Sequence, residues 1–246
     1  SLYFFLASIL ALILFSCCKE TPDMTACNVS SADTSFQMLE RVGIGESIRF
    51  FPTDTILASR NSIYFAATDT TADEYTWQIG TDPRIFMGKS IELGFAQPNQ
   101  TVNIELIQKR NSDNPCYGKL PNEVNYTKKL TVLGDFTKLP IIGDFYGYNL
   151  SDSTKRFTVS VLQNGITNIP FPTGKDYTFR NEISYGSTAL YLAGKGTYDP
   201  EHGAYSTSGF GYLRQGNSVL QIDYTYSMPT AYGRISVKDT FVGVKK

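Results

Sequence analysis

Short segments in which apolar and polar residues alternate recur along this 246-residue chain, and this pattern constrains its fold more than any other feature. Clear examples are Ser62–Ala66, Thr76–Ile79, Ser90–Leu93 and Val102–Ile107. A period of two places every second side chain on the same face of a strand, and Gly, Pro, Asn and Asp bound the segments at intervals of roughly 10 to 15 residues. The sequence therefore predicts an all-β protein that contains an antiparallel sandwich.

A second unit of the same kind is expected after a break at Leu133–Pro140, where Gly and Pro interrupt the pattern. The first unit is predicted to cover residues 39–134 and the second residues 139–246. The second unit is expected to form a small barrel or a sandwich from eight short antiparallel strands with little helix. These strands are Ile141–Leu150, Lys155–Leu162, Asp176–Ile183, Ala189–Ala193, Tyr205–Leu213, Ser218–Ser227, Gly233–Val237 and Thr240–Val244.

One motif in the first unit resembles a known family. The segment Glu74–Gly80, Glu-Tyr-Thr-Trp-Gln-Ile-Gly, is similar to the Tyr-x-Trp-x-Phe-Gly core of polycystic-kidney-disease (PKD) domains, which are immunoglobulin-like sandwiches. Ile63–Ala67 and Thr101–Ile107 match the strands on either side, whereas Ile79 replaces the usual Phe and Thr81–Pro83 replaces the Gly-Asp-Gly turn. The resemblance implies a PKD-like spacer or interaction module without a catalytic constellation.

The sole tryptophan, Trp77, belongs to this motif and is predicted to lie in the core of the sandwich, with sugar stacking as the alternative.

The first residues have the character of a signal peptide. Leu2–Phe15 carries no charge and is shorter than the roughly 20 residues that a membrane-spanning helix needs. The tetrapeptide Leu14-Phe15-Ser16-Cys17 resembles the bacterial lipobox, which implies a signal peptide over residues 1–17, lipidation of Cys17 and a tether over residues 18–38. Lipidation of Cys18 and an uncleaved anchor helix are the alternatives.

Lys19–Asp23 resembles the charged export tags of Bacteroidetes-type surface lipoproteins. This resemblance implies an outer-membrane lipoprotein on the cell surface, with the periplasmic face of the membrane as the alternative. We expect the protein to act there as a binding or accessory component of an outer-membrane assembly, with a protein partner in that membrane. Exported proteins can form disulfides, so Cys27 and Cys116 are either bridged or two free thiols.

Residues that could carry chemistry are scarce. The single histidine, His202, lies in a turn-forming segment without a nucleophile motif, and no paired His or Cys spacing predicts a metal site. We therefore expect a non-catalytic protein with no cofactor and no metal. A net charge of −1 without a basic stripe argues against nucleic acid as a partner. A glycoside hydrolase with two carboxylates is the alternative of a different class.

Aromatic residues are frequent near the end of the chain. They could form an exposed patch that binds a glycan, or they could pack across strands and stabilise a sheet. The predicted candidates for ligand binding are Tyr205, Tyr212, Tyr224, Tyr226 and Tyr232.

Overall fold

The computed structural model describes residues 35–60, 62–111, 122–163, 165–170, 176–180, 183–199, 203–214, 216–230 and 233–246. Within these ranges the regular structure consists of strands in three sheets, apart from one short 3-10 turn, Phe136–Lys138. The prediction of an all-β protein is therefore confirmed.

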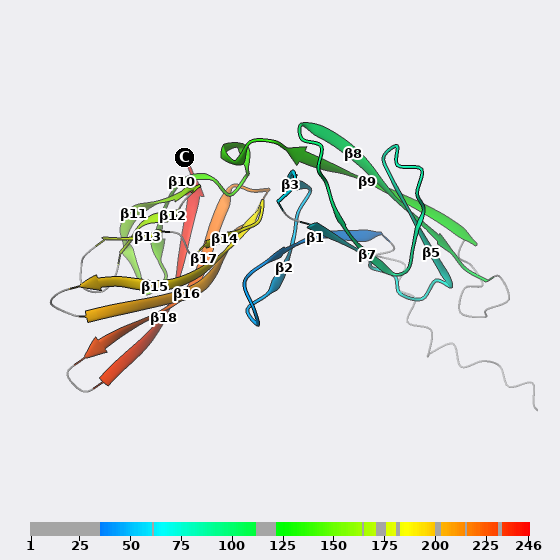
Figure 1. Cartoon of the computed structure of the whole chain (residues 1–246). Helices are drawn as coiled ribbons and strands as arrows, with labels where there is room; N and C mark the ends of the chain where they lie inside the picture. The colour runs from blue at the N-terminus through cyan, green and yellow to red at the C-terminus, as the bar shows by residue number, and fades with distance from the viewer. Residues whose placement is uncertain are drawn as a thin grey trace, which may run out of the picture.

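Two of the sheets belong to the first unit and pack face to face as a sandwich (Figure 1). One sheet has the strand order β2-β1-β4-β7, and the other has the order β3-β9-β8-β5-β6. Neighbouring strands are antiparallel except for β3 and β9, which are parallel. The strands are β1 (Phe36–Val42), β2 (Arg49–Pro52), β3 (Thr55–Leu57), β4 (Ser62–Ala67), β5 (Glu74–Ile79), β6 (Phe86–Met87), β7 (Ser90–Gly94), β8 (Gln100–Lys109) and β9 (Glu123–Leu133).

The alternating pattern builds the core of this sandwich. Trp77 on β5 is fully buried, lies edge-on to Phe36 with 5.2 Å between the ring centroids, and donates a hydrogen bond of 2.8 Å from Nε1 to the Gly88 carbonyl oxygen. The prediction that Trp77 is a core residue is confirmed. Phe36 and Met38 are also buried in this core. They belong to β1, which starts three residues before the start predicted for the sandwich.

A short connection joins the last strand of the sandwich to the first strand of the nine-stranded sheet. After β9 ends at Leu133, the carboxylate of Asp135 accepts hydrogen bonds from the backbone and hydroxyl of Thr137 and caps the 3-10 turn. Strand β10 then begins at Gly143.

The second unit is one nine-stranded antiparallel sheet with the order β13-β12-β11-β10-β18-β17-β16-β15-β14. Two meanders, β10 to β13 and β14 to β18, are joined because β10 pairs with β18. Figure 1 shows the sheet curled, and Cα atoms of β13 come within 8 Å of β15. The strands are β10 (Gly143–Asn149), β11 (Asp152–Leu162), β12 (Gly165–Pro170), β13 (Asp176–Arg180), β14 (Ile183–Tyr185), β15 (Ala189–Asp199), β16 (Gly203–Arg214), β17 (Val219–Thr230) and β18 (Gly233–Lys245).

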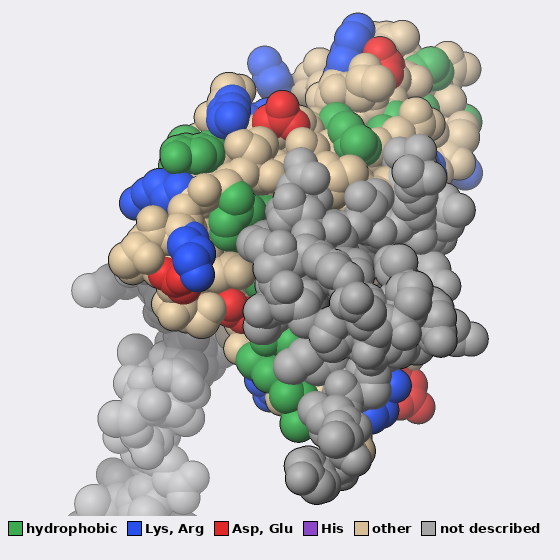
Figure 2. Space-filling view, turned by 90° about the vertical axis from the view of Figure 1, so that its left-hand side faces the viewer, with side chains coloured by type: hydrophobic (Ala, Val, Ile, Leu, Met, Phe, Trp, Pro, Cys, Tyr) green, Lys and Arg blue, Asp and Glu red, His purple; other side chains and the backbone are tan. Residues whose placement is uncertain are grey.

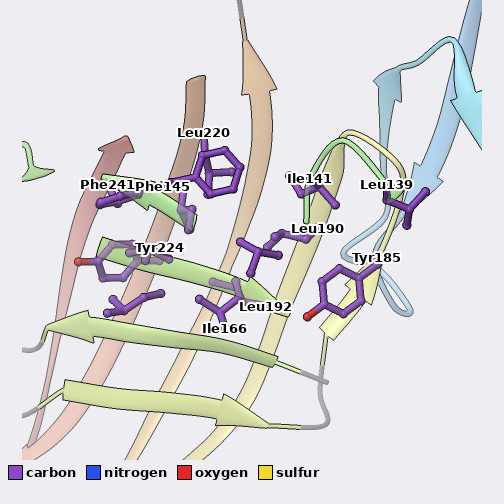
Figure 3. Close-up of a cluster of buried hydrophobic side chains, with 14 of the residues drawn as sticks. Leu139, Ile141, Phe145, Ile166, Tyr185, Leu190, Leu192, Leu220, Tyr224 and Phe241 are labelled. Carbon is purple, nitrogen blue, oxygen red and sulfur yellow. The ribbon is translucent and has the colours of Figure 1, made fainter. Parts of the chain in front are cut away.

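The curled sheet encloses its own hydrophobic core on the inner face (Figure 3). Fully buried side chains from both meanders meet there, and Tyr224 and Tyr185 lie at opposite ends of the cluster in the view of Figure 3. The members with 0% exposure are Ile141, Phe145, Val159, Val161, Ile166, Ile169, Leu190, Leu220, Ile222 and Phe241.

Several predicted strands of this unit differ from those in the structure. Strand β12 was missed because Gly165, Asn168 and Pro170 are turn formers, and the pairing with β11 and β13 overrides their local preference. The segments Gly233–Val237 and Thr240–Val244 form the single strand β18, because β17 pairs with it along its whole length. The predicted strand Asp176–Ile183 is divided between β13 and β14.

The two units are in direct contact. The turn between β14 and β15 packs against the hairpin of β1 and β2, where the Glu40 carboxylate accepts a hydrogen bond from the Ser187 backbone N–H. The Thr188 hydroxyl donates a hydrogen bond of 3.0 Å to the Pro52 carbonyl oxygen, and Leu57 of the sandwich joins the core of the second unit. The contact fixes the β1–β2 hairpin against the nine-stranded sheet.

Candidate functional site

A groove of about 660 Å³ lies between the β1–β2 hairpin and the outer face of the nine-stranded sheet. The register of the sheet arranges its floor in two cross-strand rows. One row runs Tyr191, Phe210, Asp223 and Thr240 over strands β15 to β18. The other runs Ala193, Ser208, Thr225 and Lys238 over the same strands. Side chains directly opposite one another share a face of the sheet, so the floor combines rings, hydroxyls and charges.

The first row contributes an aromatic platform. The rings of Tyr191 and Phe210 have centroids 4.8 Å apart, and the Arg49 guanidinium carbon lies 4.3 Å from the Phe210 centroid. Phe51 contacts Phe210 and Tyr212 at centroid distances of 5.8 and 5.9 Å. Strand alternation explains this arrangement, because it turns Arg49 and Phe51 of β2 toward the second unit and Phe50 toward Tyr64 in the sandwich.

Hydrogen bonds hold the acidic group of the platform in place. Asp223 Oδ1 accepts hydrogen bonds from the Thr240 hydroxyl at 2.9 Å and from Gln221 Nε2 at 2.7 Å. The neighbouring carboxylate, Asp239, is paired in register with the buried Tyr224 and therefore belongs to the inner face. Asp223 and Asp239 thus alternate between the two faces of the sheet, although both residues line the groove.

A second cavity, of about 630 Å³, lies at the inner face beside Phe157, Tyr224, Tyr226 and Val237. Burial, followed by the charge of Asp239, raises the pKa of the Tyr224 and Tyr226 phenols, so both stay protonated at neutral pH. Both tyrosines belong to the core of the unit, and we take the more polar groove on the outer face as the candidate site.

Charges of both signs are mixed over the second unit. In the face shown in Figure 2, Lys and Arg, Asp and Glu, and hydrophobic side chains of the described residues are interspersed. Such a surface does not favour a nucleic-acid interface.

No family model, curated protein or solved structure matches this chain. The resemblance of Glu74–Gly80 to the PKD core therefore stays a prediction, and the structure shows only that this segment lies in a β-sandwich.

The structure separates the tyrosines that the sequence grouped together. Tyr212 lies on the outer face against Phe51, whereas Tyr224 and Tyr226 are 3% and 4% exposed on the inner face. The side chain of Tyr205 and the whole of Tyr232 lie outside the described residues. A single patch cannot therefore contain Tyr212 together with Tyr224 and Tyr226, and a role in ligand binding stays a prediction for each tyrosine.

Other predicted positions are not described. Cys17, Cys27, Cys116 and His202 lie outside the described residues, so the lipidation site and the disulfide stay predictions. Within the described ranges, no group of three or more His, Cys, Asp or Glu side chains could hold a metal ion, and no helix is long and apolar enough to cross a membrane.

Sequence reasoning missed Arg49 and Tyr191, which line the groove, and Phe51, which packs against Phe210 beside it. Alternation along each strand could have indicated which face each side chain occupies. The contact between β2 and the second unit, however, joins segments far apart in the chain and left no local signal.

Proposed function

We propose that this chain is a non-catalytic, lipid-anchored binding protein of the outer membrane, acting as an accessory component of an assembly there and capturing a glycan in the groove between its two units. The partly exposed ring of Tyr191, which packs on the buried Phe210 and is bordered by hydroxyls and carboxylates, is the observation that carries this proposal. The PKD-like sandwich would act as a spacer and supply one wall of the site.

The chemistry of the groove suits a sugar. The apolar face of a pyranose ring can stack on an aromatic ring, while its hydroxyls need partners that both donate and accept hydrogen bonds. Ser208 and Thr225 lie in the neighbouring row, two residues along their strands from Phe210 and Asp223, at a distance of about 7 Å. An open groove on a sheet surface also leaves room for a chain longer than one sugar.

The proposed lipid anchor is inferred from the sequence alone. A cleaved leader and a lipidated Cys17 would hold both units at a membrane surface, where multiple acyl chains give stable attachment. Mass spectrometry of the membrane-bound protein should find a processed first residue, Cys17, carrying acyl chains. An intact leader, or an unmodified Cys17 in a soluble cytosolic protein, would disprove the anchor.

A glycan array with protein starting at Lys19 tests the ligand class. We expect binding to at least one polysaccharide, and Tyr191→Ala should reduce it by about tenfold or more because one face of the platform is lost. Tyr146→Ala is the matched control, since Tyr146 is 46% exposed and does not line the groove. Absence of binding to every polysaccharide would reject the glycan and leave a protein partner, which a pull-down from native membranes in mild detergent would identify.

A further inference from the structure

The groove contains two cations that make no ion pair. Arg49 lies above Phe210, and Lys238 ends the row of Ser208 and Thr225. Among the described residues, no carboxylate lies within 4.0 Å of the charged nitrogens of either side chain, and both residues are exposed. Their charges are therefore available to a ligand.

Two carboxylates, Asp223 and Asp239, line the groove together with these two cations. Asp223 shares the outer face, but its Oδ1 already accepts hydrogen bonds from Thr240 and Gln221. Asp239 belongs to the inner face and is held by the Ser151 hydroxyl at 2.5 Å and the Thr240 backbone N–H at 2.8 Å. Both carboxylates are thus engaged in hydrogen bonds, whereas neither cation makes an ion pair with a described carboxylate.

We infer that the glycan is an anionic polysaccharide, whose carboxylate or sulfate groups pair with Arg49 and Lys238 while a sugar ring stacks on the partly exposed ring of Tyr191. This inference rests on the proposed function, since it specifies the ligand of the same groove. The guanidinium of Arg49 is suited to a planar carboxylate and the ammonium of Lys238 to any anionic oxygen.

Two matched pairs of polymers test the role of charge. Polygalacturonate is compared with its fully methyl-esterified form, and dextran sulfate with dextran, by titration calorimetry at 50 and 500 mM NaCl. We expect at least one anionic polymer to bind about tenfold or more tightly than its neutral partner, with affinity falling at high salt because screening weakens exposed ion pairs. The polymer pair in which the anionic member binds more tightly shows whether the groove prefers carboxylate or sulfate.

Variants locate the effect in the groove. Arg49→Gln and Lys238→Gln should each weaken binding of the anionic polymer about two- to fivefold, as expected for exposed ion pairs. Lys129→Gln removes the same charge from an exposed position on β9, away from the groove, and should leave affinity unchanged. Far-UV circular dichroism checks that all three variants fold.

The outcomes separate this inference from the proposed function. Equal, salt-insensitive binding of charged and neutral polymers would overturn the inference and leave a glycan-binding groove. Equal losses in Lys129→Gln and in the two groove variants would also overturn it, because net charge alone would then explain the binding. If none of the four polymers and no glycan on the array binds, the proposed function fails with it.

Discussion

The carboxylate of Glu40 accepts a hydrogen bond from the backbone N–H of Ser187, although the two residues lie 147 positions apart. Glu40 is 1% exposed on β1 of the sandwich, and Ser187 is fully buried in the turn that connects β14 to β15. A charged group that is almost fully buried needs such a partner, because desolvation without compensation costs several kcal/mol. This contact explains how the wall and the floor of the groove are held together.

Gly186, next to Ser187, should not tolerate a side chain. A Cβ atom there would lie 2.7 Å from both Glu40 Oε2 and Val42 Cγ2, closer than atoms pack. We expect Gly186→Ala to lower the free energy of unfolding by about 1–3 kcal/mol. Urea titration followed by circular dichroism measures the loss.

Gly94→Ala is the control for this substitution, since a Cβ at Gly94 meets nothing within 4 Å and its φ is not positive. The fluorescence of Trp77 reports on unfolding of the sandwich alone. Its unfolding midpoint should differ from the midpoint measured by circular dichroism only in Gly186→Ala. Equal stability of Gly186→Ala and wild type would contradict the packing described for the contact.

Trp77 should dominate the stability of the sandwich. Truncation in Trp77→Ala removes a fully buried ring and its hydrogen bond to Gly88, and should cost about 3–5 kcal/mol. Thermal unfolding followed by circular dichroism provides the measurement. Ile85→Ala, at a side chain that is 62% exposed, should change stability little. A small loss in Trp77→Ala would show that Trp77 is not the centre of this core.

Asp69 and Arg110 form a buried ion pair, and the stability that this pair contributes should depend on pH. Their side chains are 8% and 1% exposed, and Arg110 Nη2 bonds Asp69 Oδ2. Burial raises the pKa of Asp69, but hydrogen bonds from Thr71 and Arg110 and the charge of Arg110 together lower it below 3.8. The folded state therefore favours the carboxylate, and this stabilisation is present above about pH 4 and is lost as pH falls through the folded pKa.

We expect Asp69→Asn to cost about 3 kcal/mol at pH 7, because it leaves a buried guanidinium without its carboxylate. The difference from wild type should shrink when urea titrations are repeated near pH 3. Asp82→Asn, in the exposed pair with Arg84, is the comparison and should have little effect at pH 7. A difference that stays constant with pH would exclude this role for Asp69.

Tyr185 should make the second unit sensitive to alkali. Burial raises the pKa of Tyr185 to about 12, and its hydroxyl donates a hydrogen bond of 2.7 Å to the Leu162 carbonyl oxygen. Between about pH 10 and 12 the unfolded chain releases this proton and the folded chain keeps it, so stability falls as pH rises.

Tyr185→Phe should therefore cost about 1 kcal/mol at pH 8, from the lost hydrogen bond, and progressively less above pH 10. Unfolding midpoints between pH 8 and 11 measure this convergence. The exposed Tyr146→Phe should give the same difference from wild type at each pH. Parallel curves for Tyr185→Phe and wild type would rule out the buried phenol as a source of alkaline sensitivity.

Alternation predicted which residues form the sandwich core, and Trp77, Ile104 and Leu106 are all buried as that pattern requires. The same reasoning failed at β12, where turn-forming residues pair with neighbouring strands, and it could not place the tyrosines near the end of the chain. Tyr212 on β16 and Tyr224 on β17 were grouped together by sequence, yet they lie on opposite faces of the sheet. The register between strands decides which residues are opposite each other, and one sequence does not encode that register locally.

The sequence by itself determined the all-β class and the burial of the single tryptophan, because both follow from period-two patterning. Only the tertiary structure decided that Arg49 and Phe51 meet Phe210, that Asp223 and Asp239 face opposite ways, and that Glu40 pairs with Ser187. These relationships join residues from distant segments, and the free energy that selects them comes from packing and desolvation between whole sheets.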